Sequence, residues 1–245
     1  MVEVNNLTKI FPGKKGTKVL AVDNLTFKCS PGEIYGLLGP NGAGKTTTLR
    51  MLSTALKPTE GSAVINGFDV VSQSNKVRST VGFLSSATGL YRRLTGKEMI
   101  QYFGKLNGMK GQELNERVNQ LMSLMDITPF ANRKCDKLST GQKQRVSICR
   151  CIVHDPPVMI LDEPAEGLDI IAAEIIVEFI RECRNNGKCV IFSTHIMAEA
   201  ETLCDRIGII NEGKLCAEGT QEALKTRFSA DSLNEVFRCA VNDKR

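Results

Sequence analysis

The sequence predicts an α/β fold with a mainly parallel sheet, an amino-terminal antiparallel β part and a helical insertion. Short apolar runs alternate with stretches of helical periodicity, which is typical of strands and helices that follow one another in a parallel sheet. A glycine-rich loop follows one of these strands and opens a helix. A long segment in the middle of the chain carries only helical patterns, which indicates an insertion.

Length and composition suit one globular domain over residues 1–245. The chain is 42% hydrophobic and 24% charged, and its net charge is +5. This mild charge does not select a class of partner. The pair Lys14 and Lys15 is too short for a nucleic-acid-binding arm, so we expect no nucleic-acid partner.

The amino-terminal part is predicted to contain antiparallel strands followed by the first strand of the core. Val19–Cys29 alternates apolar and polar residues and ends at a Ser-Pro-Gly turn. Ile34–Leu38 is a short apolar run typical of a buried strand, and a helix is expected from Lys45 to about Ala55. Ser62–Ile65 with the following Asn66-Gly67 predicts a hairpin strand and its turn.

The segment from about 86 to 155 is predicted to form a helical subdomain. Apolar residues recur there at helical spacing, and packing into a core explains them better than a binding stripe does. They are Leu114, Val118, Leu121, Met122 and Met125.

Strand patterns return after this insertion, with a helix between the first two. The strands are expected at Val158–Leu161, Val190–Phe192 and Arg206–Ile210, and the helix at about Ile170–Asn185. We find no internal repeat, so the chain is interpreted as a single α/β domain.

The cysteine pattern favours free thiols in a reducing cytoplasm. The chain has nine cysteines and two histidines, without a C-x-x-C pair, which argues against a zinc site. The amino terminus lacks the apolar region of a signal peptide. No apolar run approaches the roughly 20 residues that cross a bilayer, so a membrane function would need a second, membrane-spanning chain.

The segment Gly39–Thr46 fits the phosphate-binding loop motif G-x-x-x-x-G-K-[ST], which predicts a P-loop NTPase core. The loop backbone would surround phosphates, Lys45 would neutralise them and Thr46 would ligate Mg²⁺. A purely structural glycine turn would not require this spacing between a strand and a helix. The residues expected to bind nucleotide here are Gly39, Pro40, Asn41, Gly42, Ala43, Gly44, Lys45, Thr46 and Thr47.

Two acidic residues follow the apolar strand at 158–161. Asp162 is expected to hold Mg²⁺, and Glu163 is expected to orient or deprotonate an attacking water. An acidic residue after an apolar run is a weak signal alone, but it becomes specific beside a phosphate loop.

Leu138–Gln142 reads L-S-T-G-Q at the start of a predicted helix, and it resembles the L-S-G-G-Q signature of the ATP-binding-cassette family. The order along the chain also resembles the family: phosphate loop, signature, acidic strand, Gly167–Asp169 and His195. The resemblance covers nearly the whole chain. It implies an ATPase that uses ATP and Mg²⁺.

The resemblance implies roles for residues outside the phosphate loop. Ser139, Gly141 and Gln142 would cap the nucleotide held by a second copy of the chain in an ATP-dependent homodimer. Without nucleotide, we expect the chain to be mostly monomeric. His195 would contact the γ-phosphate as a catalytic switch beside Glu163 and Lys45. Phe11 resembles the aromatic residue that stacks on adenine.

Two positions depart from the family pattern, and one histidine lies outside it. Thr140 replaces a glycine of the signature, and Ser86 stands where the family has a glutamine that links the site to the transporter. Ser86 could reach the site only through a water. His154 has no motif around it and is expected on the surface.

The resemblance to ATP-binding-cassette transporters implies a peripheral subunit on the cytoplasmic side of the cell membrane, bound to a separate polytopic permease. Gly82–Thr95 and Asp231–Phe237 resemble the NatA group of sodium-export ATPases. Export of drugs or lipids by the same type of system remains an alternative. So do a soluble cassette ATPase outside transport and a regulatory module that uses ATP only to dimerise.

Overall fold

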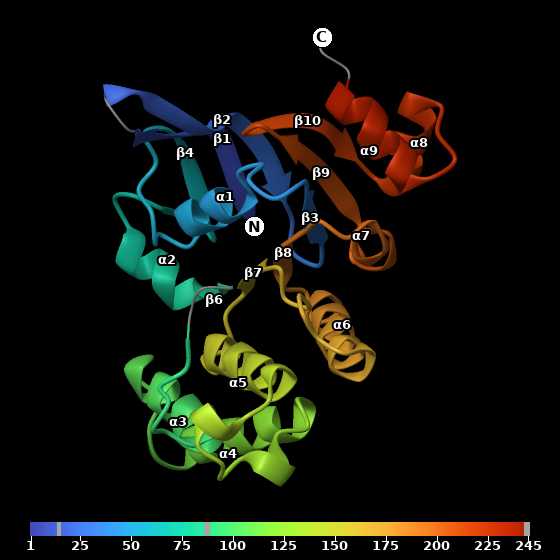
Figure 1. Cartoon of the computed structure of the whole chain (residues 1–245). Helices are drawn as coiled ribbons and strands as arrows, with labels where there is room; N and C mark the ends of the chain where they lie inside the picture. The colour runs from blue at the N-terminus through green and yellow to red at the C-terminus, as the bar shows by residue number, and fades with distance from the viewer. Residues whose placement is uncertain (14–15, 86–88, 243–245) are drawn as a thin grey trace.

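Two sheets and a group of helices make up the chain in a computed structural model, which describes residues 1–13, 16–85 and 89–242 (Figure 1). The first sheet has the strand order β2-β1-β4-β5 and is antiparallel. Its strands are β1 (Val2–Pro12), β2 (Lys18–Cys29), β4 (Glu60–Ile65) and β5 (Phe68–Asp69).

The second sheet forms the core and has the strand order β10-β9-β3-β8-β7-β6. Every neighbouring pair is parallel except β9 and β10, which form an antiparallel hairpin. The strands are β3 (Ile34–Leu38), β6 (Val81–Leu84), β7 (Val158–Asp162), β8 (Cys189–Thr194), β9 (Arg206–Asn211) and β10 (Lys214–Gly219). All residues of β3, β7 and β8 are buried, which explains their continuous apolar runs.

The two sheets pack against each other near the start of the core. Phe27 of β2 stacks on Tyr35 of β3, with ring centroids 4.7 Å apart. Both side chains are buried in an apolar cluster that includes residues of β1, β2, β3 and α1 (Lys45–Leu52). This contact places the antiparallel sheet beside the loop that joins β3 to α1.

Helices cover the core sheet and form most of the segment between β6 and β7. In that segment, α3 (Gly96–Leu106), α4 (Gly111–Leu124) and α5 (Thr140–Ile152) share one apolar cluster, which contains the five residues expected from their helical spacing at 114–125. Figure 1 shows them at the end of the molecule opposite α8 and α9. The other helices are α2 (Ser74–Thr80), α6 (Ile170–Asn185), α7 (Met197–Leu203), α8 (Gln221–Phe228) and α9 (Leu233–Asn242).

Two predictions from the sequence are wrong in detail. The first helix ends at Leu52 instead of about Ala55, because Thr54 adopts a left-handed backbone conformation with φ 64°. His154 is half-buried, not on the surface, and both of its ring nitrogens are buried. Burial lowers the pKa of this histidine.

The structure also shows the state of the cysteines and the character of the helices. All nine cysteines are free thiols. Within the described ranges, no helix has both the length and the apolar character needed to span a bilayer.

Candidate functional site

The phosphate loop lies between β3 and α1, and its geometry requires glycine. Gly44 has φ 106°, and a Cβ at this residue would lie 2.5 Å from the carbonyl oxygen of Ala21. At Gly39, a Cβ would lie 2.3 Å from the carbonyl oxygen of Ile210. The backbone can therefore fold tightly against β2 and β9 only without these side chains.

The loop surrounds a pocket of about 140 Å³, and Lys45 is one of the residues that line it. Only 4% of Lys45 is exposed. Its Nζ donates to the carbonyl oxygens of Gly39 at 2.7 Å and Pro40 at 3.2 Å. The residues that line the pocket are Ala21, Pro40, Asn41, Gly42, Ala43, Gly44, Lys45, Thr46, Thr47 and Glu163.

Asp162 is buried at the carboxyl end of β7 and connects the phosphate loop to β8. Its Oδ1 accepts hydrogen bonds from Thr46 Oγ1 at 3.1 Å and from Ser193 Oγ at 2.7 Å. Its Oδ2 is buried without a hydrogen-bond partner. A buried carboxylate oxygen beside a threonine hydroxyl is the donor chemistry that Mg²⁺ prefers, so these residues fit the cation.

Glu163 has an unusual backbone conformation and lies close to Lys45 and His195. Its φ is 48°, and its amide N–H donates to Ser193 Oγ at 3.1 Å. One carboxylate oxygen, Oε1, lies 3.3 Å from Lys45 Nζ and 3.2 Å from His195 Nδ1. A left-handed conformation at a non-glycine residue costs energy, and such positions cluster at functional sites.

The charges around Glu163 keep it ionised. Burial raises the pKa of this carboxyl group, but the close contact with His195 and the Lys45 charge together outweigh burial and lower it. Glu166 behaves in the opposite way, because its hydrogen bond and repulsion with Glu163 raise its pKa. Near neutral pH Glu163 is therefore a carboxylate, as a group that accepts a proton from water must be.

Sequence reasoning missed Ser193 and Glu166. Ser193 stands opposite Asp162 in the register of the parallel strands β7 and β8. A hydroxyl at the end of a buried strand, two residues before His195, was the available signal. Glu166 lies three residues after Glu163 in the same loop.

The signature residues begin α5 and do not line the pocket of their own chain. Ser139 and Gln142 form a reciprocal capping box: Ser139 Oγ accepts from the amide of Gln142 at 3.3 Å, and Gln142 Oε1 accepts from the amide of Ser139 at 3.1 Å. A Cβ at Gly141 would lie 3.1 Å from Cβ of Ala172 in α6. The Thr140 side chain is exposed.

The residue expected to stack on adenine also lies away from the pocket lining of its own chain. Phe11 is half-buried near the end of β1, where Lys9 Nζ lies 5.2 Å from its ring centroid. Ser86, the departure at the family's glutamine position, lies outside the described residues. The structure thus brings together Lys45, Asp162 and Glu163, with His195 beside them.

Comparisons with known proteins identify the family of this chain. The ABC transporter family matches residues 22–166. The chain is 38% identical to the ABC transporter ATP-binding protein NatA of Bacillus subtilis (strain 168), over 97% of this chain and 96% of NatA. It is 32% identical to the linearmycin resistance ATP-binding protein LnrL of the same organism, over 99% of this chain and 76% of LnrL.

Solved structures show the same fold. An ATP-binding subunit of an ABC transporter superposes with a TM-score of 0.87 at 29% identity, over 98% of this chain and 99% of that one. A dimeric ATP-binding cassette in a post-hydrolysis state, bound to ADP and Pi, gives 0.82 at 28% identity, over 90% of this chain and 98% of that one. The chain therefore belongs to the ABC transporter family, as an ATP-binding subunit with ATPase activity.

Proposed function

We propose that this chain hydrolyses ATP in the pocket beside Glu163 and thereby drives an exporter. The observation that carries the proposal is the position of Glu163, ionised and next to Lys45 at the phosphate loop. Fixed charges and dipoles at such a position stabilise a phosphoryl-transfer transition state without reorganisation. The regulatory alternative, in which ATP only promotes dimerisation, gives no reason for the strained backbone at Glu163.

Each residue of the site has a distinct role in this proposal. Loop amides and Lys45 bind phosphate oxygens, and Glu163 accepts a proton from the attacking water. His195 orients the carboxylate of Glu163 and contacts the γ-phosphate. Thr46 and Asp162 would hold Mg²⁺, which supplies charge neutralisation to the phosphates when it is bound.

A second copy of this chain would complete the site. The signature residues 139–142 lie away from the pocket of their own chain, and the dimeric cassettes among the similar structures show how such a fold can pair.

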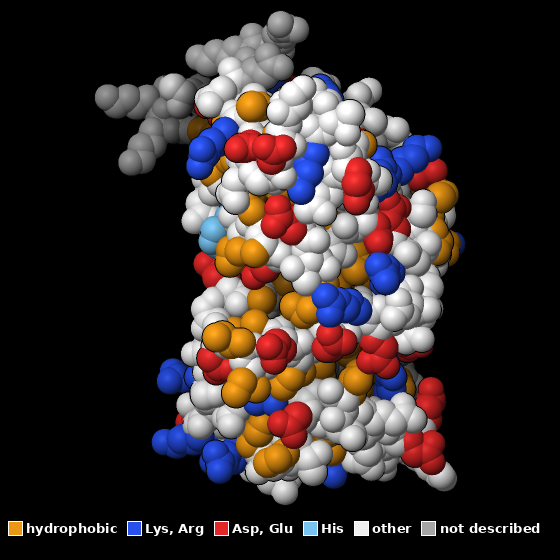
Figure 2. All heavy atoms as spheres, turned by 90° about the vertical axis from the view of Figure 1, so that its right-hand side faces the viewer, with side chains coloured by type: hydrophobic (Ala, Val, Ile, Leu, Met, Phe, Trp, Pro, Cys, Tyr) orange, Lys and Arg blue, Asp and Glu red, His pale blue; other side chains and the backbone are white. Residues whose placement is uncertain are grey.

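Exposed apolar residues at the start of α6 support the same dimer. Ile170 and Ile171, directly after the Gly167–Asp169 loop, are 78% and 74% exposed. Figure 2, which faces the side that carries α6, shows hydrophobic side chains among the acidic ones at the surface. Exposed apolar residues of this kind favour an interface that is covered in the ATP-bound state.

A groove between the core and the helical segment fits the permease. It has a volume of about 360 Å³ and lies beside the loop after α1, at the junction with α3 and α5. Its lining combines apolar side chains such as Phe83 with the basic residues Arg78 and Arg150 and the half-buried His154. We propose that a cytoplasmic segment of a polytopic permease binds here, which would place the chain on the cytoplasmic side of the membrane.

Na⁺ is our proposed cargo. Support comes from the 38% identity with NatA over nearly the full length of both chains, together with the sodium-export resemblance of Gly82–Thr95 and Asp231–Phe237. Drug export is the second candidate, because LnrL is a linearmycin resistance protein and is 32% identical. Flux of Na⁺ and of drugs through the reconstituted transporter separates the two.

The substitution Glu163→Gln tests the site. We expect ATP turnover to fall by at least about 100-fold, because the amide cannot accept a proton from water, while MgATP binding persists. The variant should then accumulate as an ATP-bound dimer in size-exclusion chromatography with light scattering. Glu222→Gln, an exposed change on α8, is the matched control and should retain turnover. Undiminished hydrolysis by Glu163→Gln would overturn the proposed mechanism.

A further inference from the structure

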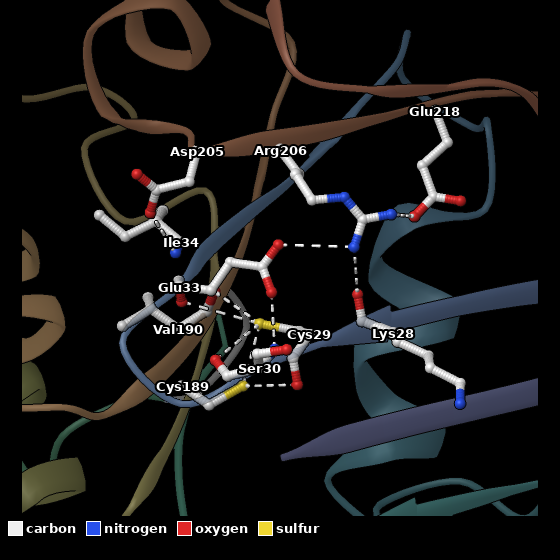
Figure 3. A network of polar contacts seen from close by, with 10 residues as sticks. All are labelled: Lys28, Cys29, Ser30, Glu33, Ile34, Cys189, Val190, Asp205, Arg206 and Glu218. Atoms are coloured by element: carbon white, nitrogen blue, oxygen red, sulfur yellow. Dashed lines mark hydrogen bonds and ion pairs between the residues drawn. The ribbon is translucent and has the colours of Figure 1, made fainter.

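Two buried cysteines meet where the two sheets join, away from the ATP pocket. Cys29 is the last residue of β2, and Cys189 is the first residue of β8 (Figure 3). Neither side chain is exposed to solvent. Their Sγ atoms are 3.0 Å apart, although 160 residues separate them in the chain.

This separation is short for two thiols that only pack against each other. Non-bonded carbon atoms already prefer about 3.5–4.0 Å, and sulfur is larger. A disulfide bond measures about 2.05 Å, so the two sulfurs need to approach by only about 1 Å. The separation thus lies between the length of a disulfide bond and that of an ordinary non-bonded contact.

Backbone hydrogen bonds fix both strands at the cysteines. The amide of Gly32 donates to the carbonyl of Lys188 at 3.0 Å, and the amide of Val190 donates to the carbonyl of Glu33 at 2.9 Å. The thiol of Cys189 also donates to the carbonyl of Cys29 at 3.5 Å. With both chain segments held in place, the sulfurs stay opposed, and bond formation demands little rearrangement.

Charged residues enclose the pair on one side. Arg206 contacts Glu218 at 2.6 Å and Glu33 at 3.5 Å, and it donates to the carbonyl of Lys28 at 3.3 Å (Figure 3). The hydrogen bond with Cys189, and then burial, raise the pKa of Cys29. A protonated, buried thiol reacts slowly, so we expect oxidation during folding or after local opening of β2.

We propose that Cys29 and Cys189 are a disulfide site, oxidised by a small-molecule disulfide such as oxidised glutathione. One cysteine thiolate attacks the small disulfide, forms a mixed disulfide and releases one equivalent of reduced thiol. The second cysteine then attacks the protein sulfur of the mixed disulfide and releases the other equivalent. The protein loses two protons and two electrons, and the small disulfide gains them as it becomes two thiols.

The bond would tie the antiparallel sheet to the core. β2 is an edge strand of its sheet, whereas β8 lies inside the core sheet. A link between residues 160 positions apart strongly restricts the unfolded chain. For a domain of this size we expect the oxidised protein to melt about 10 °C above the reduced protein.

The test uses the full chain, both native and after unfolding and refolding, in a glutathione redox buffer. We expect a Cys29–Cys189 linkage in peptide mapping by mass spectrometry, and a fall from the nine thiols of the sequence to seven after two are oxidised. The melting temperature of each sample is measured with and without reductant.

Three variants decide the outcome. Cys29→Ala and Cys189→Ala should lose both the linkage and the reductant-sensitive part of the melting temperature. Cys149→Ala removes a buried cysteine elsewhere and should retain both. Because each variant is compared with its own reduced form, general destabilisation cancels. A refolded wild type that keeps nine thiols, or that links Cys29 and Cys189 no more often than other pairs, overturns the proposal.

Discussion

At the scale of single residues, Ser193 holds the two acidic side chains in place. Its hydroxyl donates to Asp162 Oδ1 at 2.7 Å and accepts from the amide of Glu163 at 3.1 Å. Ser193 has no exposed surface. One buried hydroxyl thus orients the proposed Mg²⁺ ligand and also stabilises the strained backbone of the proposed catalytic carboxylate.

The change Ser193→Ala should lower ATP turnover by about tenfold and raise the Mg²⁺ concentration needed for half-maximal activity. The reason is that Asp162 loses a hydrogen bond that sets its orientation. ATPase rates measured across a Mg²⁺ titration check both effects. Ser147→Ala, at another buried serine, is the matched control. If both variants show the Mg²⁺ dependence of the wild type, Ser193 has only a packing role.

At the scale of elements, two helices of the segment between β6 and β7 begin with the same device. Thr95 and Glu98 form a capping box at α3, just as Ser139 and Gln142 do at α5. Each box satisfies backbone N–H groups that the first helical turn leaves free. The two caps are equivalent for stability, but only Ser139 belongs to the proposed signature.

Because both helices begin with the same kind of cap, a comparison of Thr95 and Ser139 variants distinguishes the structural role of Ser139 from its proposed role in the dimer. Thr95→Ala and Ser139→Ala should each cost about 1 kcal/mol of stability, because each removes a side-chain cap. Only Ser139→Ala should also weaken ATP-dependent dimerisation and lower ATPase activity by more than this destabilisation explains. Denaturant unfolding and ATPase assays on the same samples decide the matter. Equal losses of ATPase activity in both variants would show that Ser139 acts only as a helix cap and has no role in the dimer.

At the scale of the whole molecule, the sequence predicted features that local patterns encode and missed those that depend on pairing between distant segments. The glycine spacing of the phosphate loop and the apolar run of β7 are local, and both elements are where they were expected. The partners of Ser193 follow from the register between β7 and β8, and Cys29 meets Cys189 across 160 residues. The early end of α1 depends on the left-handed conformation of Thr54, a residue type that gives no such signal.

The groove between the core and the helical segment also joins parts that are distant in sequence. Ala55 from the loop after α1, Phe83 from β6 and Phe103 from α3 all line it. A bound permease can respond to movement between the core and the helical segment only if it contacts both sides of the groove. Its binding energy then differs between the two arrangements of these parts, and this difference couples the permease to the ATPase. The proposed permease contact therefore depends on the folded chain and could not be located from any one segment of the sequence.

A charge inside the groove should prevent this contact. Ala55 is exposed, so Ala55→Glu introduces an anionic side chain into a largely apolar lining without disturbing the core. We expect at least a tenfold loss of the polytopic protein that co-purifies with the chain from detergent-solubilised membranes of its host. The matched control is Ala223→Glu, at an exposed position in the first turn of α8, where an acidic residue suits the helix dipole. Equal recovery of the membrane protein with both variants would place the permease contact on another surface.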